Sequence, residues 1–467
     1  MSLSPPRSLG PVPTVTGPIP VTATSVPFRS ASARESSLYV DLLAVAYVEE
    51  EWFLAGTADA IDPDGEVLEA DAPYTTRVLV RRPRDAERFS GAVFVEPFHN
   101  LNEDTPAWTS EYRYLIRSGH AWVGLTVSSG TFGPAGTSRG GGVAQLREFD
   151  AERYGSLHLL AYEHGPTRAA PPGPGGFDPV LMRWRLAIAT AQGHAIAAQL
   201  FGLLERNDPA SPLAALAVDR VYATGWSQTG LFLQQFLERG YHEAMGEASP
   251  FRHGAVVSGY LIAVGPAPEH RPASAVLVNL LSEGEVVGTL SPGFRVDDDT
   301  DDPCFRGYEV PGSFHHWEVK PGAQRRQVEG PHDPQHDDVH NDRPWHLVVH
   351  AILDNLDRWV RDGVPMPRAP RITRDPDAPD GVARDEYGNA HGGLRTPWLD
   401  VPTARYAPRC TCSPVTGTMI PLTDAELAAR DADHGAFVDA WEHSIDALVA
   451  DRWLLAADAD ALRADPR

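Results

Sequence analysis

The sequence predicts an α/β protein whose mostly parallel central sheet is flanked by helices. Short apolar runs rich in β-branched and aromatic residues alternate along the chain with longer segments of helical periodicity, as expected for strands and helices that build a covered sheet. The later runs are apolar at nearly every position, which suits strands buried on both faces. The first two runs alternate between apolar and polar residues, so we expect them to form an antiparallel edge.

Taken in chain order, the apolar runs predict eight strands, at 45–56, 75–83, 91–98, 121–129, 219–226, 254–260, 274–282 and 307–312. Helical periodicity predicts helices at 105–118, 178–204, 229–239, 343–361 and 424–450. The second of these is the helix that precedes the strand at 219–226. The third carries a row of apolar residues and is followed by Gly240, a residue type that commonly ends helices.

Composition restricts the class of protein. The 467 residues are 42% hydrophobic, which is enough for a sizeable core, and the net charge of −23 opposes general affinity for nucleic acid or anionic membranes. No window approaches the roughly 18 apolar residues of a membrane-spanning helix. The Pro- and Ser-rich N-terminus lacks the apolar core of a secretory signal, which favours a cytoplasmic protein.

We expect an extended arm over residues 1–44 and a single enlarged domain over 45–467. Glycine- and proline-rich loops bracket a segment at about 129–180 that we expect to form an insertion over a pocket, and 240–272 is a second candidate for such a lid.

The chain has three cysteines, Cys304, Cys410 and Cys412. An odd number without a secretory signal argues against a disulfide framework, and the C-x-C pair lacks the C-x-x-C spacing of zinc and redox motifs, although a bridge from Cys304 to either of the other two stays open. The histidine-rich stretch at 329–346 is interrupted by prolines, so its spacing of four does not place metal ligands on one helix face. We expect no metal and no cofactor.

The stretch "ATGWSQTGLFLQQFL" (223–237) places Ser227 between a predicted strand and a predicted helix. Small residues two positions before and after a serine let strand and helix cross closely and expose the hydroxyl as a nucleophile. Gly225 fills the first position and Thr229 the second, with Gly230 one place later. The alternative is a serine that only caps the helix.

Candidate partners of Ser227 follow later strands in the order acid, then histidine. Glu283 and Glu285 come after the run at 274–282, and His315, followed by His316, comes after the run at 307–312. A histidine accepts the serine proton and a carboxylate orients its ring. We favour His315 as the base, and the pattern does not decide between the two glutamates.

An oxyanion hole requires two hydrogen-bond donors. One should be the backbone amide of Gln228, directly after the serine, and the other an amide from 98–100, centred on His99, because Pro97 has no N–H. Candidate side chains that line the substrate pocket are Trp226, Phe98 and Tyr154, each of which could equally be core.

Several segments together resemble a bacterial family known as "alpha/beta hydrolase domain-containing protein". They include "YVEEEWFLAGTA", "FSGAVFVEPFHN", "GWSQTG", "GNAHGGLRTPWLDVPTA" and "CSPVTGTMIPL", and the likeness runs from about residue 45 to near the C-terminus. The resemblance implies an α/β-hydrolase fold with lid-like insertions, in which Thr229 is a normal variant at the small position. It also implies His315 as base, through the motif G-(S/T)-x-H at 312–315. The chain departs from the family at "VEPFHN", where "VEWLN" is more usual.

The expected function is a serine hydrolase that cleaves a carboxylic ester or related acyl substrate through an acyl-enzyme. One alternative is an acyltransferase that uses the same three residues, and another is a non-catalytic binding protein on the same scaffold. The expected partner is a small-molecule acyl substrate, with no nucleic acid and no membrane. The sequence leaves open the acyl group and the oligomeric state.

Overall fold

A computed structural model describes most of the chain and divides it into two compact units. Unit 1 comprises residues 1–260 and 268–275, and unit 2 comprises 261–267 and 276–467. The described residues are 9–32, 39–100, 103–130, 141–160, 188–248, 256–265, 267–270, 272, 274–288, 297–298, 304–315, 339–409, 416–430 and 433–464. Most of the expected lid at 129–180 therefore lies outside the described residues.

The largest sheet has nine strands in the order β1-β2-β3-β5-β4-β6-β7-β8-β9. These strands are β1 Thr14–Thr16, β2 Tyr47–Ile61, β3 Val67–Pro83, β4 Ala92–Pro97, β5 Ala121–Leu125, β6 Arg220–Trp226, β7 Gly259–Ala263, β8 Val276–Ser282 and β9 Cys304–Val310. Helices flank it, so the prediction of an α/β fold with a mostly parallel central sheet is confirmed. The strand expected at 254–260 begins only at Gly259.

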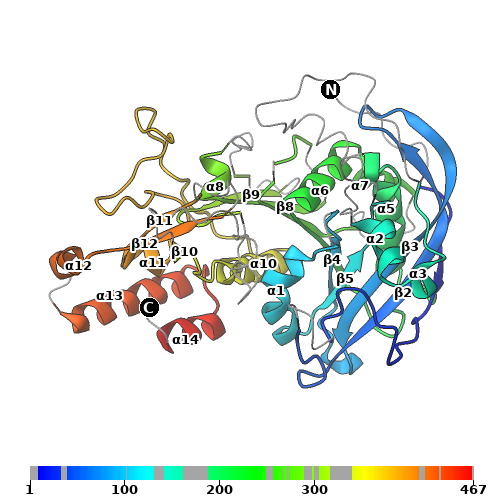
Figure 1. The fold of residues 1–467 in the computed structure, drawn as a ribbon, viewed down its shortest axis with the longest axis horizontal. Coiled ribbons are helices and arrows are strands. Elements are labelled where there is room, and N and C mark those ends of the chain that lie inside the picture. The colour runs from blue at the N-terminus through cyan, green and yellow to red at the C-terminus, as the bar shows by residue number, and fades with distance from the viewer. Residues whose placement is uncertain are drawn as a thin grey trace. The chain divides into compact units, whose positions relative to one another are not determined.

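In unit 1, the two alternating runs form the long antiparallel hairpin of β2 and β3, coloured blue in Figure 1. The short β1 from the N-terminal arm pairs with β2, and β3 pairs antiparallel with β5. β4 then runs parallel to both β5 and β6. Every residue of β4 and β5 is buried, which explains why these runs are continuously apolar.

The helices of unit 1 are η1 Ala86–Arg88, α1 Pro106–Arg117, α2 Gly142–Phe149, α3 Ala151–Tyr154, α5 Gly193–Glu205, α6 Gln228–Glu238 and α7 Tyr241–Ala248. In α6 the apolar row predicted from the sequence is largely buried, with Phe232, Leu233, Phe236 and Leu237 all facing the interior.

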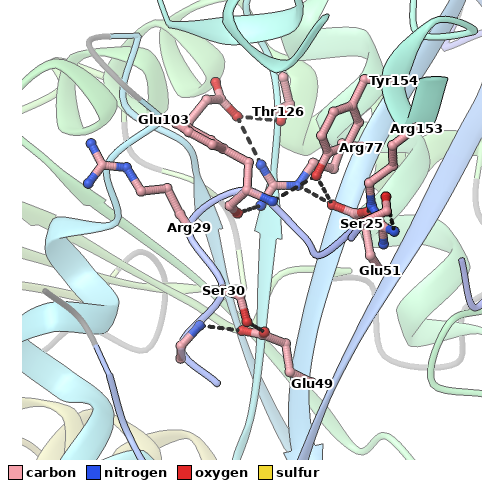
Figure 2. A network of polar contacts seen from close by, with 12 residues as sticks. Ser25, Arg29, Ser30, Glu49, Glu51, Arg77, Glu103, Thr126, Arg153 and Tyr154 are labelled. Atoms are coloured by element: carbon pink, nitrogen blue, oxygen red, sulfur yellow. Dashed lines mark hydrogen bonds and ion pairs between the residues drawn. The ribbon is translucent and has the colours of Figure 1, made fainter. Parts of the chain in front are cut away.

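A buried network of charged side chains ties β2 and β3 to their surroundings in unit 1 (Figure 2). Arg77 Nε lies 2.8 Å from Glu51 Oε1, and both side chains are fully buried. Arg153 Nε donates to the other oxygen of Glu51 at 2.6 Å. Arg77 Nη2 also donates to the carbonyl of Phe28 in the N-terminal arm at 2.7 Å. Since an unpaired buried charge is costly, these contacts hold the arm and the hairpin in one arrangement.

In unit 2, β8 and β9 run parallel in register from Val276 opposite Cys304 to Ser282 opposite Val310. A second sheet has the order β10-β12-β11, formed by β10 Val339–His340, β12 Thr418–Pro421 and β11 Ala404–Ala407. The helices are α8 Glu283–Val286, α10 His346–Asp362, α11 Pro397–Asp400, α12 Asp424–Arg430, α13 His434–Ala450 and α14 Ala456–Ala464. The helix expected at 424–450 is thus two helices.

Within the described part of the chain, no helix combines the length and apolarity needed to cross a membrane.

Candidate active site

Ser227 occupies a sharp turn between β6 and α6. Its backbone has φ 56° and ψ −115°, outside the regions that residues with a side chain normally adopt. Such a conformation costs about 1–3 kcal/mol and persists only where surrounding contacts enforce it. A strained strand-to-helix turn of this kind can expose a serine hydroxyl for nucleophilic attack.

Gly225 and Thr229 explain how the turn is held. A Cβ atom at position 225 would lie 2.5 Å from the carbonyl oxygen of Thr229 and 2.8 Å from Leu233 Cδ1, so only glycine fits where strand and helix cross. The Thr229 hydroxyl accepts the N–H of Trp226 at 2.8 Å and lies 3.0 Å from the Trp226 carbonyl, to which it donates. The threonine thus braces the turn as well as being small, a role that the sequence pattern does not reveal.

Glu285 contacts His315. Glu285 lies in the one-turn helix α8, directly after β8, and its Oε1 is 2.7 Å from His315 Nδ1. Its Oε2 accepts the backbone N–H of Ser282 at 3.2 Å, which completes a capping box at the start of α8. Two independent contacts therefore fix this carboxylate, and a carboxylate bound to Nδ1 sets the tautomer of the histidine.

Glu283 faces a different set of groups. Side chains two residues apart on a helix point in nearly opposite directions, because each residue turns about the helix axis by about 100°. Glu283 Oε2 accepts the N–H of Gly312 at 2.6 Å, and its Oε1 lies 2.7 Å from Arg384 Nη2. The side chain is fully buried. Burial raises the pKa of Glu283, and the Arg384 guanidinium partly offsets that rise.

The turn after β9 places His315. Gly312 has φ +74°, a conformation that favours glycine, and its N–H is held by Glu283 as described. Its carbonyl accepts from Asn341 Nδ2 at 2.8 Å. The Ser313 hydroxyl donates to the Val310 carbonyl at 2.6 Å. His315 is the last described residue of this segment, and the neighbouring His316 lies outside the described residues.

The expected oxyanion donors lie at the Ser227 turn and in the loop after β4. Gln228 is the first residue of α6, where backbone N–H groups have no acceptor within the helix. In the loop, the N–H of His99 donates to the carbonyl of Asp104 at 3.0 Å. The N–H of Phe98 donates to the Leu125 carbonyl at 2.8 Å. The N–H of Asn100 donates to Gln228 Oε1 at 2.9 Å, which ties this loop to the turn.

The sequence as a whole matches the model of one protein family. The family is described as "Alpha/beta hydrolase domain", and the match spans residues 15–464. The chain belongs to this alpha/beta hydrolase family. The resemblance seen in the sequence is therefore confirmed, and with it the α/β-hydrolase fold. No curated protein sequence matches this hydrolase.

Solved structures with a similar arrangement are distant. The putative dienelactone hydrolase from Klebsiella pneumoniae subsp. pneumoniae MGH 78578 is 13% identical, with coverage of 50% of this chain and 73% of that one and a TM-score of 0.24. Acetyl xylan esterase 1 from Thermoanaerobacterium sp. JW/SL YS485 is 16% identical, with 54% of each chain covered and a TM-score of 0.25. The glucuronoyl esterase from Solibacter usitatus is 11% identical, with coverage of 60% and 81% and a TM-score of 0.28.

The three side chains expected to line the substrate pocket of this hydrolase are all buried. Trp226 is 4% exposed, and Phe98 packs under the Arg77 guanidinium with 4.6 Å between the charge centre and the ring centre. The Tyr154 hydroxyl donates to Glu51 Oε1 at 2.8 Å and accepts the N–H of Phe28 at 2.8 Å (Figure 2). Tyr154 therefore belongs to the buried charge network, and a place in the pocket stays a prediction for all three.

Among the described residues, no group of three or more histidine, cysteine, aspartate or glutamate side chains is arranged to hold a metal ion. His332 and His336 of the histidine-rich stretch lie outside those residues, as do Cys410 and Cys412, so the pairing of Cys304 stays a prediction.

Proposed function

We propose that this alpha/beta hydrolase is a serine esterase that cleaves a carboxylic ester or related small acyl substrate. Ser227 is the nucleophile, His315 the general base and Glu285 the carboxylate that orients the histidine. The observation that carries the proposal is the backbone of Ser227, whose φ of 56° at a strand-to-helix turn is the conformation that exposes a nucleophile.

The reaction begins when Ser227 Oγ attacks the acyl carbon. The serine proton passes to His315 Nε2, and Glu285, bound to Nδ1 at 2.7 Å, stabilises the imidazolium that forms. Collapse of the tetrahedral intermediate returns the proton to the leaving alkoxide and yields an acyl-enzyme. Water then attacks this ester by the same route and releases the free acid.

Two further features support Ser227 as the reacting group. The serine precedes the first turn of α6, where backbone N–H groups with no acceptor within the helix and the helix dipole favour the negative charge that develops on the acyl oxygen. The order Ser227, Glu285, His315, with the latter two after β8 and β9, is the order in which this fold supplies its catalytic residues.

The proposal is tested by labelling the protein with a fluorophosphonate, which reacts with activated serines, and by following hydrolysis of p-nitrophenyl acetate. We expect the wild type to be labelled and active, and Ser227→Ala to be neither. A folded wild type that is neither labelled nor active would leave the non-catalytic binding protein as the better reading.

Hydrolysis and acyl transfer share the same acyl-enzyme and differ in whether water or another acceptor attacks it. We expect the free acid to remain the product when alcohols or amines are added at increasing concentration. An acylated acceptor that replaces the free acid would identify a transferase.

A further inference from the structure

The backbone amides expected to provide the second oxyanion donor are already hydrogen-bonded. Those of Phe98, His99 and Asn100 donate to the Leu125 carbonyl, the Asp104 carbonyl and Gln228 Oε1, at 2.8, 3.0 and 2.9 Å. Each of these bonds has ordinary geometry. A backbone N–H has a single hydrogen, so none of the three could bind a substrate oxygen without breaking an existing bond.

The side chain of Asn100 presents a different situation. Asn100 is fully buried, and in the described part of the chain neither Oδ1 nor Nδ2 of its carboxamide has a hydrogen-bond partner. A buried amide without a partner costs stability, and such groups are few in native proteins. Its Nδ2 carries two hydrogens, so Asn100 offers donors in a loop where the backbone amides of residues 98–100 are already bonded.

The backbone of Asn100 is held next to the Ser227 turn by hydrogen bonds at both its N–H and its carbonyl. Its N–H donates to Gln228 Oε1 at 2.9 Å, and its carbonyl accepts the N–H of Gly141 at 2.6 Å. The distance from Asn100 to the backbone amide of Gln228 is therefore spanned by one glutamine side chain. Gln228 therefore carries the first expected oxyanion donor and also holds the loop that carries Asn100.

The far end of the same loop is anchored in the buried charge network. Glu103 is fully buried at φ 51°, and it accepts the Thr126 hydroxyl at 2.5 Å and the N–H of Gly142 at 2.8 Å. Arg77 Nη1 lies 3.8 Å from its Oε2 (Figure 2). Arg29 of the N-terminal arm pairs with the adjacent Asp104 at 2.9 Å. The described residues on both sides of 101–102 are thus held before any substrate arrives, as a preorganised donor requires.

We propose that Asn100 Nδ2–H is the second oxyanion donor of this enzyme, and that the Gln228 side chain is the positioning residue that sets Asn100 against the Ser227 turn. The inference rests on the proposed esterase function. As Ser227 Oγ forms its bond to the acyl carbon, the C=O π electrons move onto the oxygen, which then accepts hydrogen bonds from Gln228 N–H and Asn100 Nδ2–H. No proton is transferred to the oxyanion.

The test compares Asn100→Ala and the near-isosteric Asn100→Leu, both of which lack the donor, with Asn355→Ala as a control. Asn355 is 1% exposed, and its side chain donates to the Ala351 carbonyl in α10 at 2.8 Å and to the Arg452 carbonyl at 2.7 Å. We expect both Asn100 variants to lose about 10²–10³-fold in kcat on p-nitrophenyl acetate with KM within about threefold. The control should keep its kcat and lose thermal stability.

Stability separates a catalytic role of Asn100 from a structural one. Asn100→Ala removes a buried group that has no partner, so its Tm should equal or exceed that of the wild type. Asn100→Ser keeps one O–H donor and should recover part of the lost kcat. Gln228→Ala should lower kcat, whereas Gln228→Glu keeps an acceptor for the Asn100 N–H and should retain more activity.

Folded Asn100 variants with kcat near the wild-type value would overturn the proposal while leaving the esterase function intact. Failure of both donor-free variants to fold would also overturn it, because it would make Asn100 a stability residue. A wild type that is neither labelled at Ser227 nor active would instead overturn the proposed function on which the inference rests.

Discussion

We expect Glu285→Gln and Glu283→Gln to impair this enzyme in different ways, although the two residues lie in the same one-turn helix. Glu285 contacts His315 at 2.7 Å, whereas Glu283 contacts the Gly312 N–H and Arg384. The first substitution removes the negative charge beside the imidazole of His315, the proposed general base. The second removes the negative charge from a buried ion pair behind the turn.

The structure sets the size of each effect. A neutral amide in place of Glu285 no longer stabilises the imidazolium, and it can hold the wrong tautomer, which costs about 10³–10⁴-fold in kcat, or about 4–5.5 kcal/mol. Glutamine is accepted at the third position of a capping box, so α8 should persist with little loss of stability. Glu283→Gln weakens two buried hydrogen bonds to a charged group, which costs about 2–3 kcal/mol of folding free energy.

The measurements are kcat on p-nitrophenyl acetate and Tm for each variant, prepared side by side. We expect Glu285→Gln to be folded and nearly inactive, and Glu283→Gln to melt at lower temperature while losing no more than about tenfold in kcat. Equal and mild losses of activity in both would reject the assigned triad acid. An inactive Glu283→Gln beside an active Glu285→Gln would assign the role to Glu283.

Three further substitutions test other parts of the structure. Gly225→Ala places a Cβ 2.5 Å from a carbonyl oxygen of α6, so it should lower the free energy of unfolding by about 1–3 kcal/mol and abolish fluorophosphonate labelling. In the control Gly202→Ala the nearest atom would lie 3.8 Å from the new Cβ, and we expect neither effect. Glu111 is fully buried without a partner among the described residues, and burial raises its pKa well above 4.5, so the folded protein keeps a proton that the unfolded chain releases. Glu111 should therefore lower the stability of the wild type as pH rises above 4.5, by at most about 1.4 kcal/mol per pH unit, and Glu111→Gln should remove this contribution from the pH dependence of urea unfolding; an unchanged slope would contradict the assignment. Arg77→Met leaves Glu51 with one cationic partner fewer in the buried network and should cost about 3–5 kcal/mol of unfolding free energy, and an unchanged urea midpoint would show that the network contributes nothing.

Local pattern alone predicted much of the sheet. The continuously apolar runs at β4, β5 and β8 and the alternating runs at β2 and β3 each carry their periodicity within a few residues, and the structure places strands there. The predicted helix at 424–450 was wrong in one respect, because α12 ends at Arg430 and α13 begins at His434. Asp433 caps the second helix through a 2.9 Å bond to the Ala436 N–H, a signal present in the sequence.

The choice between the two glutamates is an intermediate case. Ser282 and Glu285 have the spacing of a capping box, and that pattern favours a fixed position for Glu285 at the start of α8. The partner of Glu283, however, is Arg384, which is 101 residues away in the sequence. No local pattern links those two side chains, so the structural role of Glu283 becomes visible only in the folded chain.

By itself, therefore, the sequence determined the α/β class, the family and the placement of Ser227 between a strand and a helix, because each of these depends on neighbouring residues or on motifs read in order. Tertiary structure alone decided that His315 binds Glu285, that the amides of the loop after β4 are already bonded, and that Asn100 is buried without a partner. Hydrogen bonds and burial depend on groups that the chain brings together from distant positions, and local periodicity carries no information about them.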